Sequence, residues 1–174
     1  KDAVLYVEGR QFSVKVLYTR EPVEDFVEAA VFAVLTIHLR RGPGDVLVFL
    51  DGQENIETMR AVLKDRLKAL GDRCNPMIVL PLFAALNPRD QMKCFLPAKD
   101  PRARKVILAT NIAETSVTIP GVTYVVDSGV HKLRTYDGNR GISRLATVGI
   151  SRASARQRAG RAGRERSGFC YRLY

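Results

Sequence analysis

The sequence GPGDVLVFLDG over residues 42–52 decides the fold, together with the helical pattern that follows it. Val46–Leu50 is a short continuous apolar run, which is typical of a strand buried on both faces of a parallel sheet. Gln53–Leu70 has apolar residues at helical spacing, and Gly71 ends it. A buried strand that leads directly into a helix predicts an α/β sheet with parallel strands.

The same alternation continues on both sides of this unit. Toward the N-terminus the pattern predicts a strand and then a helix, Phe12–Tyr18 and Glu21–Arg40, before the turn residues Gly42-Pro43-Gly44. Toward the C-terminus it predicts a strand, a short helix and two more strands: Met77–Leu82, Pro88–Leu96, Lys105–Ala109 and Val122–Val126. The fold class is therefore α/β, with a mostly parallel sheet covered by helices on both faces.

The last third of the chain departs from this alternation. Two alternating segments, Val130–Tyr136 and Ile142–Val148, flank a glycine-rich turn and predict a β-hairpin. Ser151–Arg166 has helical character, and Phe169–Tyr174 has the pattern of a closing strand. We find no internal repeat and no linker, so we expect one domain over residues 1–174.

Composition sets limits on the class of protein. The 174 residues are 46% hydrophobic and 26% charged, as in soluble globular proteins. No apolar run is long enough to cross a bilayer, and the first residues do not resemble a signal peptide. The cysteines Cys74, Cys94 and Cys170 are odd in number and lack metal-ligand spacing, so we expect reduced thiols in an intracellular protein.

The net charge of +10 is concentrated at one end of the chain. Residues 130–174 hold 11 Lys and Arg against 2 Asp and Glu. Such a basic end on an otherwise balanced domain indicates a polyanionic partner, nucleic acid or nucleotide phosphate. A solvated basic face is the alternative that composition alone leaves open.

The segment QRAGRAGR over residues 157–164 is the strongest chemical signal. Gln157, Arg161 and Arg164 are spaced at i, i+4 and i+7, which predicts that one helix face presents all three. Gly160 and Gly163 each weaken a helix interior, so we expect something to approach the backbone closely there. Two arginines and an amide suit a phosphate group and an attacking water, whereas a merely solvated basic helix explains neither the glycines nor the glutamine.

These residues resemble motif VI of superfamily 2 helicases, QRxGRxGR. The preceding Ser-x-Ala-Ser at 151–154 is similar to the DEAH-box family form. Residues 109–120, ATNIAETSVTIP, resemble motif V of that family, and residues 45–56, DVLVFLDGQENI, resemble motif IV, with Asp51 where the family usually has Thr. The resemblance spans the whole chain and implies the second RecA-like domain of a DEAH-box RNA helicase, with the hairpin inserted between motifs V and VI.

The resemblance implies a role for each matching residue. Gln157, Arg161 and Arg164 would act on ATP, and the other nucleotide-binding residues would be Phe95, Ser116, Thr118 and Gly160, with Phe95 stacking on adenine. The contacts to single-stranded RNA would come from Thr110, Asn111 and Ala84. We expect the hairpin to separate strands or guide RNA, because its basic residues suit a prong that contacts phosphates: Lys132, Arg134, Arg140 and Arg144. The alternatives are helix caps or turns for the Ser and Thr residues, a core position for Phe95 and a plain connecting hairpin.

Two features of the sequence qualify the expected chemistry. Pro120 stands where many family members carry an Asp that bonds the ribose, so discrimination at the 2′-hydroxyl is expected to be weak. The chain has no GxxxxGK[ST] loop and no Asp-Glu-x-His segment. In the family both belong to the first RecA-like domain, so we expect ATP and its Mg²⁺ to be held there, no metal site in this chain, and no ATPase activity of this domain alone.

The resemblance also implies partners and leaves alternatives open. The expected partners are single-stranded RNA, ATP, the first RecA-like domain in cis and a G-patch-type activator, and no membrane. The expected location is intracellular: the nucleus, with the cytoplasm as the alternative. The C-terminal accessory domains of the family are not in the sequence. A catalytically inactive helicase-like RNA-binding scaffold and a superfamily 2 DNA helicase are the alternative functions.

Overall fold

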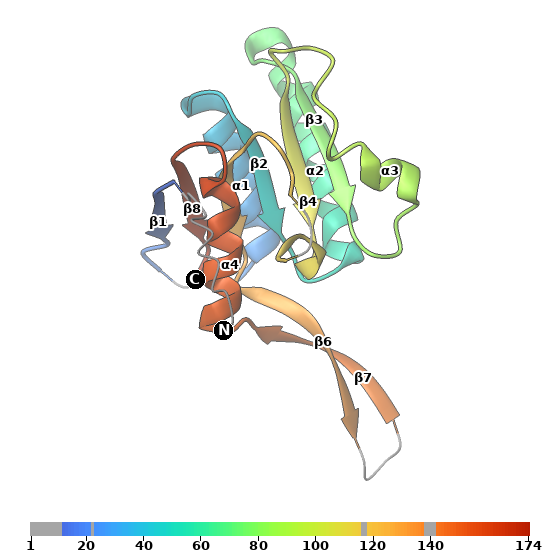
Figure 1. The fold of residues 1–174 in the computed structure, drawn as a ribbon. Coiled ribbons are helices and arrows are strands. Elements are labelled where there is room, and N and C mark those ends of the chain that lie inside the picture. Colours follow the sequence, from blue (N-terminus) through green and yellow to red (C-terminus); the bar gives the residue numbers. More distant parts are fainter. Residues whose placement is uncertain (1–11, 22, 116–117, 138–141) are drawn as a thin grey trace, which may run out of the picture.

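Six parallel strands form the central sheet of the computed structural model, which describes residues 12–21, 23–115, 118–137 and 142–174. The strand order is β1-β8-β5-β2-β4-β3 (Figure 1). Every neighbouring pair in this sheet is parallel. The strands are β1 (Val14–Tyr18), β2 (Asp45–Phe49), β3 (Met77–Leu82), β4 (Arg104–Ala109), β5 (Val122–Asp127) and β8 (Gly168–Arg172).

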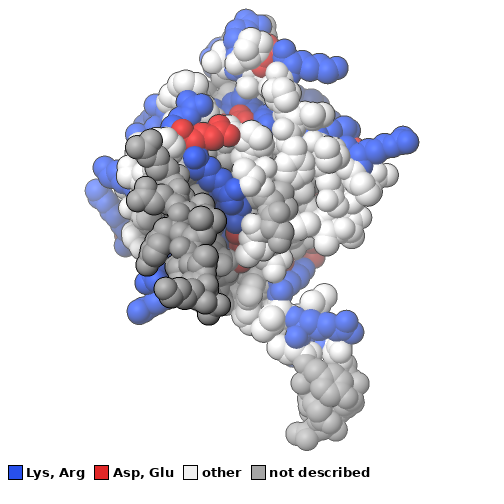
Figure 2. All heavy atoms as spheres, in the orientation of Figure 1, with Lys and Arg blue, Asp and Glu red and all other residues white. Residues whose placement is uncertain are grey.

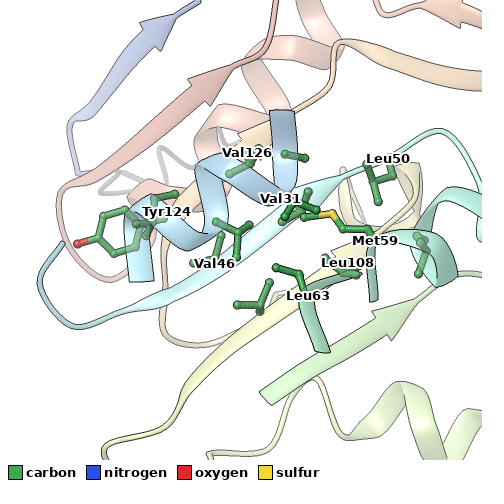
Figure 3. Close-up of a cluster of buried hydrophobic side chains, with 14 of the residues drawn as sticks. Val31, Val46, Leu50, Met59, Leu63, Leu108, Tyr124 and Val126 are labelled. Carbon is green, nitrogen blue, oxygen red and sulfur yellow. The ribbon is translucent and has the colours of Figure 1, made fainter. Parts of the chain in front are cut away.

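Helices cover both faces of this sheet, as predicted. On one face α1 (Phe26–Arg40) and α2 (Gln53–Leu70) pack on alternate strand residues such as Val46, Val48 and Leu108 (Figure 3). The intervening residues, including Leu47, Phe49 and Ile107, point to the other face, where α4 (Arg152–Gly160) contributes Ala159. This alternation along each strand produces two cores, one on each side of the sheet.

Local capping explains where the helices begin and end. Asp25 accepts hydrogen bonds from the amides of Val27 and Glu28 at 2.9 and 3.0 Å, so α1 begins at Phe26 and not at Glu21. Gly71, with a φ of 56°, ends α2 at the predicted residue. Pro88 opens α3 (Pro88–Met92) as predicted, but this helix is shorter than the expected Pro88–Leu96.

The prediction of one helix over Ser151–Arg166 is wrong beyond Gly160. The α-helix ends there, and a 3₁₀ turn, η3 (Arg161–Gly163), follows. Ser151 caps the helix by accepting from the amide of Ser154 at 3.1 Å. A second 3₁₀ turn, η2 (Asn111–Ala113), follows β4, and a third, η1 (Gly71–Arg73), follows α2.

The predicted hairpin is present and stands apart from the sheet. β6 (Val130–Asp137) and β7 (Ile142–Gly149) pair antiparallel, and Figure 1 shows them projecting away from the sheet. The turn that contains Arg140 lies outside the described residues. No described helix is both long enough and apolar enough to span a membrane.

Candidate nucleotide and nucleic-acid site

The arginines predicted to act together lie at the junction between α4 and η3. Gln157 is exposed on α4, Arg161 is the first residue of η3, and Arg164 follows the turn and is half-buried. Because the backbone tightens after Gly160, the three residues are not presented by one regular helix face, and that prediction is wrong. What brings the two arginines together is a shared contact with the loop after β4.

Both arginines donate to the segment between β4 and β5. Arg161 is 8% exposed, and its Nη2 donates to the backbone carbonyl of Thr115 at 2.9 Å and to that of Glu114. Arg164 Nη1 donates to the hydroxyl of Thr118. The two sequence segments with the strongest chemical signal, 109–120 and 157–164, therefore lie in direct contact.

The electrostatics of this contact favour an anion. Burial lowers the pKa of Arg161, and the positive charge of Arg164 lowers it further, against the opposing effect of Glu114. A guanidinium whose charge is disfavoured by a second cation gains from a negatively charged ligand. Figure 2 shows Lys and Arg side chains predominating over Asp and Glu on the face where α4 lies.

The two glycines of the segment differ in their surroundings. A β-carbon on Gly163 would lie 2.5 Å from the carbonyl oxygen of Phe12 and 2.7 Å from Val14 Cγ2. The close approach at Gly163 is therefore made by the chain's own first strand. Among the described residues, a β-carbon on Gly160 would meet nothing within 4 Å, so none of them blocks a ligand from that backbone.

Thr110 and Ala84 lie at the carboxyl edge of the sheet, where α/β proteins bind ligands. Thr110 directly follows β4, and Ala84 follows the neighbouring β3 after one residue. Asn111, at the start of η2, is exposed. The Thr110 side chain makes no capping hydrogen bond to η2, so its hydroxyl is not used as a cap and the capping alternative fails.

The hairpin adds basic groups at the same edge. Lys132 and Arg134 on β6 and Arg144 on β7 are exposed. A β-carbon on Gly52, the N-cap of α2, would lie 3.0 Å from Lys132 Nζ. Lys132 therefore lies beside the amino-terminal end of an 18-residue helix, and both groups attract phosphate.

The remaining predicted residues are more scattered. Phe95 is half-buried and packs against the core on the α4 side of the sheet, so part of its ring serves the core alternative. Ser116 lies outside the described residues. Of the described residues, no three His, Cys, Asp or Glu are grouped as metal ligands.

Comparison with known proteins identifies the family. The model of the helicase conserved C-terminal domain matches residues 29–166. This chain belongs to the helicase C-terminal domain family of the DEAH/RHA helicases. It is 48% identical over 174 residues to the pre-mRNA-splicing factor ATP-dependent RNA helicase prp22 of Schizosaccharomyces pombe, covering 100% of this chain and 15% of that protein.

A second curated protein and a solved structure are also similar to this chain. The human ATP-dependent RNA helicase DHX33 is 49% identical over 174 residues, covering 98% of this chain and 24% of that protein. The crystal structure of Escherichia coli DEAH/RHA helicase HrpB superposes with a TM-score of 0.83 and 40% identity, covering 95% of this chain and 20% of that one. The chain thus spans less than a quarter of the curated relatives named here, and its RecA-like fold is confirmed.

The structure contains a buried polar network around Arg158 that the sequence did not predict. Arg158, inside the QRAGRAGR segment, is 0% exposed and donates to the carboxylates of Glu114 and Asp127 at 2.7 and 2.8 Å. The spacing in the sequence could have revealed it, because Ala155, Arg158 and Ala159 recur as on one helix face. The structure buries all three against the sheet. An arginine in that register must find partners inside the protein.

Proposed function

We propose that this domain is the second RecA-like half of an ATP-driven RNA helicase motor and supplies Arg161 and Arg164 to an ATP held mainly by a first RecA-like domain. The observation that carries the proposal is that both arginines rest on the loop after β4, at 115 and 118. Arg161 donates to two backbone carbonyl oxygens and Arg164 donates to a hydroxyl oxygen, and these acceptors are uncharged. Phosphate oxygens are stronger acceptors and would replace them.

In this arrangement the chain's own residues have separate tasks. Arg161 and Arg164 donate to the terminal phosphate and stabilise the charge that develops on it during transfer. Gln157, exposed one turn before Arg161, orients the attacking water. Gly160 leaves room for the phosphates, Thr118 and Ser116 respond to their presence, and the exposed part of Phe95 stacks on the base.

The described residues offer no site for the metal that accompanies ATP. Mg²⁺ prefers carboxylate oxygens and phosphates, and the described residues provide no acidic cluster for it. Glu114 and Asp127 are occupied by Arg158. We therefore assign Mg²⁺ to the first RecA-like domain, which explains why this domain alone is expected to be inactive.

The RNA track runs along the carboxyl edge of the sheet. Thr110 offers a hydroxyl that does not cap η2, Asn111 offers an exposed amide, and Ala84 offers main-chain groups to the sugar-phosphate backbone. Lys132 and the first amides of α2 converge on one phosphate. Contacts of this kind hold a strand without reading its sequence, and Pro120 adds no ribose contact.

The names of the relatives support this reading over its alternatives. Prp22 and DHX33 are both named ATP-dependent RNA helicases, which favours RNA over DNA. An inactive scaffold would have no use for two charged arginines placed side by side. A nuclear location and a G-patch-type activator belong to the proposal as expected features of a relative of splicing helicases.

The experiment is a comparison of ATP hydrolysis by the isolated domain and by the full-length parent, with and without RNA or DNA. We expect no turnover by the domain, and turnover by the parent that RNA stimulates more than DNA does. Hydrolysis by the isolated domain that Arg161→Ala abolishes would contradict the split site. An inactive parent would favour the scaffold, and equal stimulation by DNA would favour a DNA helicase.

A further inference from the structure

Arg158 lies in the chain between Gln157 and Arg161, which are proposed to act on ATP, but its side chain points into the protein. Gln157 is exposed, whereas Arg158 is fully buried, with its guanidinium carbon 4.8 Å from the centre of the Phe49 ring. Phe49 is the last residue of β2, in the middle of the sheet. Arg158 therefore cannot touch a nucleotide, and its role lies inside the domain.

The guanidinium of Arg158 joins three separate segments. Its Nε donates to Glu114 Oε1 at 2.7 Å, in the loop after β4. Its Nη1 donates to Asp127 Oδ1 at 2.8 Å, at the end of β5, and to the carbonyl of Val130 at 3.2 Å, at the first residue of β6. One side chain of α4 thus binds both the loop after β4, at Glu114, and the base of the hairpin, at Val130.

Glu114 connects this network to the nucleotide-facing arginine. Its carboxylate accepts from Arg158 and from the hydroxyl of Ser154 at 2.5 Å, while its backbone carbonyl accepts from Arg161. If a ligand binds Arg161 and breaks its hydrogen bond to that carbonyl, the hydrogen bonding of Glu114 changes, and Glu114 is also bound by Arg158. The path from Arg161 to Val130 runs through two residues.

Asp127 fixes the other end of the path. Its Oδ1 also accepts from the amide of Gly129 at 3.0 Å, and its Oδ2 accepts from the hydroxyl of Tyr174 at 3.2 Å. Asp127 is 0% exposed, so removing its partner would leave a buried charge uncompensated. The hydrogen bonds of Asp127 therefore fix the direction in which the hairpin leaves the sheet.

A second tether holds the other strand of the hairpin. The hydroxyl of Thr147 on β7 donates to Asp51 Oδ2 at 2.8 Å, and Asn55 on α2 donates to Asp51 Oδ1 at 2.6 Å. Asp51 is the residue at which the sequence departs from the usual Thr of its family. A carboxylate there accepts from both sides, so β6 and β7 are each fastened at the base.

We propose that Arg158 is a positioning residue that couples the nucleotide site to the hairpin, so that α4 and the hairpin move as one body when Arg161 engages phosphate. The inference rests on the proposed function of Arg161, and it assigns a role to a residue that touches neither ATP nor RNA. A well-packed apolar side chain could fill the same volume. What it could not do is hold Glu114, Asp127 and Val130 together.

The test uses the full-length parent with Arg158→Lys, which keeps the charge but loses the planar fork that reaches several acceptors. Spin labels at Leu145 on β7 and Arg156 on α4, both exposed, report the orientation of the hairpin through their distance distribution. Unwinding and ATPase rates are measured on the same variant. Arg156→Lys, without labels, is the control for the two rates.

We expect Arg158→Lys to broaden the distance distribution and to lower unwinding about tenfold more than basal ATPase. A distribution as narrow as that of the parent, or an equal loss of both rates, would overturn the inference. In a parent whose hairpin is shortened, Arg158→Lys should lower unwinding no further, because effects on one pathway are not additive. An equal loss in both backgrounds would also overturn it.

A second variant covers the case in which Arg158→Lys does not fold. Thr147→Val removes only the hydroxyl that donates to Asp51 from a residue that is otherwise exposed, and it should broaden the distribution and lower unwinding about threefold with basal ATPase unchanged. An unaltered distribution in this variant would count against the coupling. A parent with no ATPase at all would instead refute the proposed function, and the distance distributions would still decide the present inference.

Discussion

The Nη2 of Arg161 lies 2.9 Å from the backbone carbonyl oxygen of Thr115. This hydrogen bond places a charged group from the end of the chain against a loop that lies 46 residues earlier. The backbone carbonyls of Glu114 and Thr115 hold the guanidinium in place. Contacts within the domain therefore position the proposed phosphate-binding arginines before phosphate binds.

Substitution of the two glycines should have opposite effects on stability. Gly163→Ala should lower the free energy of unfolding by about 1–3 kcal/mol, because the added carbon would overlap the Phe12 carbonyl. Gly160→Ala should raise it by up to about 1 kcal/mol, because the space is open and alanine favours helix.

Thermal or urea unfolding of the two variants measures both effects. In the full-length parent, Gly160→Ala should nevertheless raise the KM for ATP, since the open space is the room for phosphates. An unchanged KM would show that no ligand approaches Gly160.

Thr110→Ala should affect RNA and not stability. The lost hydroxyl makes no cap in the folded domain, so the melting temperature should stay within a degree or two, roughly, of the parent value. The lost contact to the RNA backbone should cost about 1 kcal/mol in binding, equally for every sequence.

RNA-stimulated ATPase and the melting temperature are measured on the same protein, with Thr110→Ser as the control that retains the hydroxyl. A lower melting temperature with normal RNA stimulation would assign Thr110 a structural role.

Lys132→Ala should weaken RNA binding in a salt-dependent way. The lysine faces the first turn of α2, and its removal deletes one phosphate contact. The slope of log K against log salt should fall by about 1, uniformly across sequences. Titrations at several salt concentrations measure the slope, and Lys68→Ala, on the last turn of α2, is the control. Equal slopes for both variants would remove Lys132 from the track.

The parts of the fold that local signals determine could be predicted from the sequence. The limits of α2 and of β3 agree with the structure because Gly71 ends the helix and the apolar run of β3 is bounded on both sides. The hairpin followed from its alternation and turn. The predicted start of α1 was wrong because apolar spacing does not show that the Asp25 side chain caps the helix at Phe26.

The end of α4 needed tertiary information. The 3₁₀ turn after Gly160 exists where Arg161 binds the carbonyls of a distant loop and Gly163 packs on Phe12. Neither contact has a local signature, so the sequence predicted a continuous helix. The identities of Arg161 and Arg164 followed from the segment itself, whereas their partners could be found only in three dimensions.

The central claim is tested most directly by the RNA-stimulated turnover number of the full-length parent carrying Arg161→Ala. The matched control is Arg156→Ala, which changes an exposed arginine of the preceding helix α4, and Arg161→Lys tests the need for the planar fork. The account predicts that Arg161→Ala lowers kcat by roughly 10³–10⁵, that Arg161→Lys restores little, and that Arg156→Ala stays near the parent value. A near-normal kcat for a folded Arg161→Ala protein would contradict it.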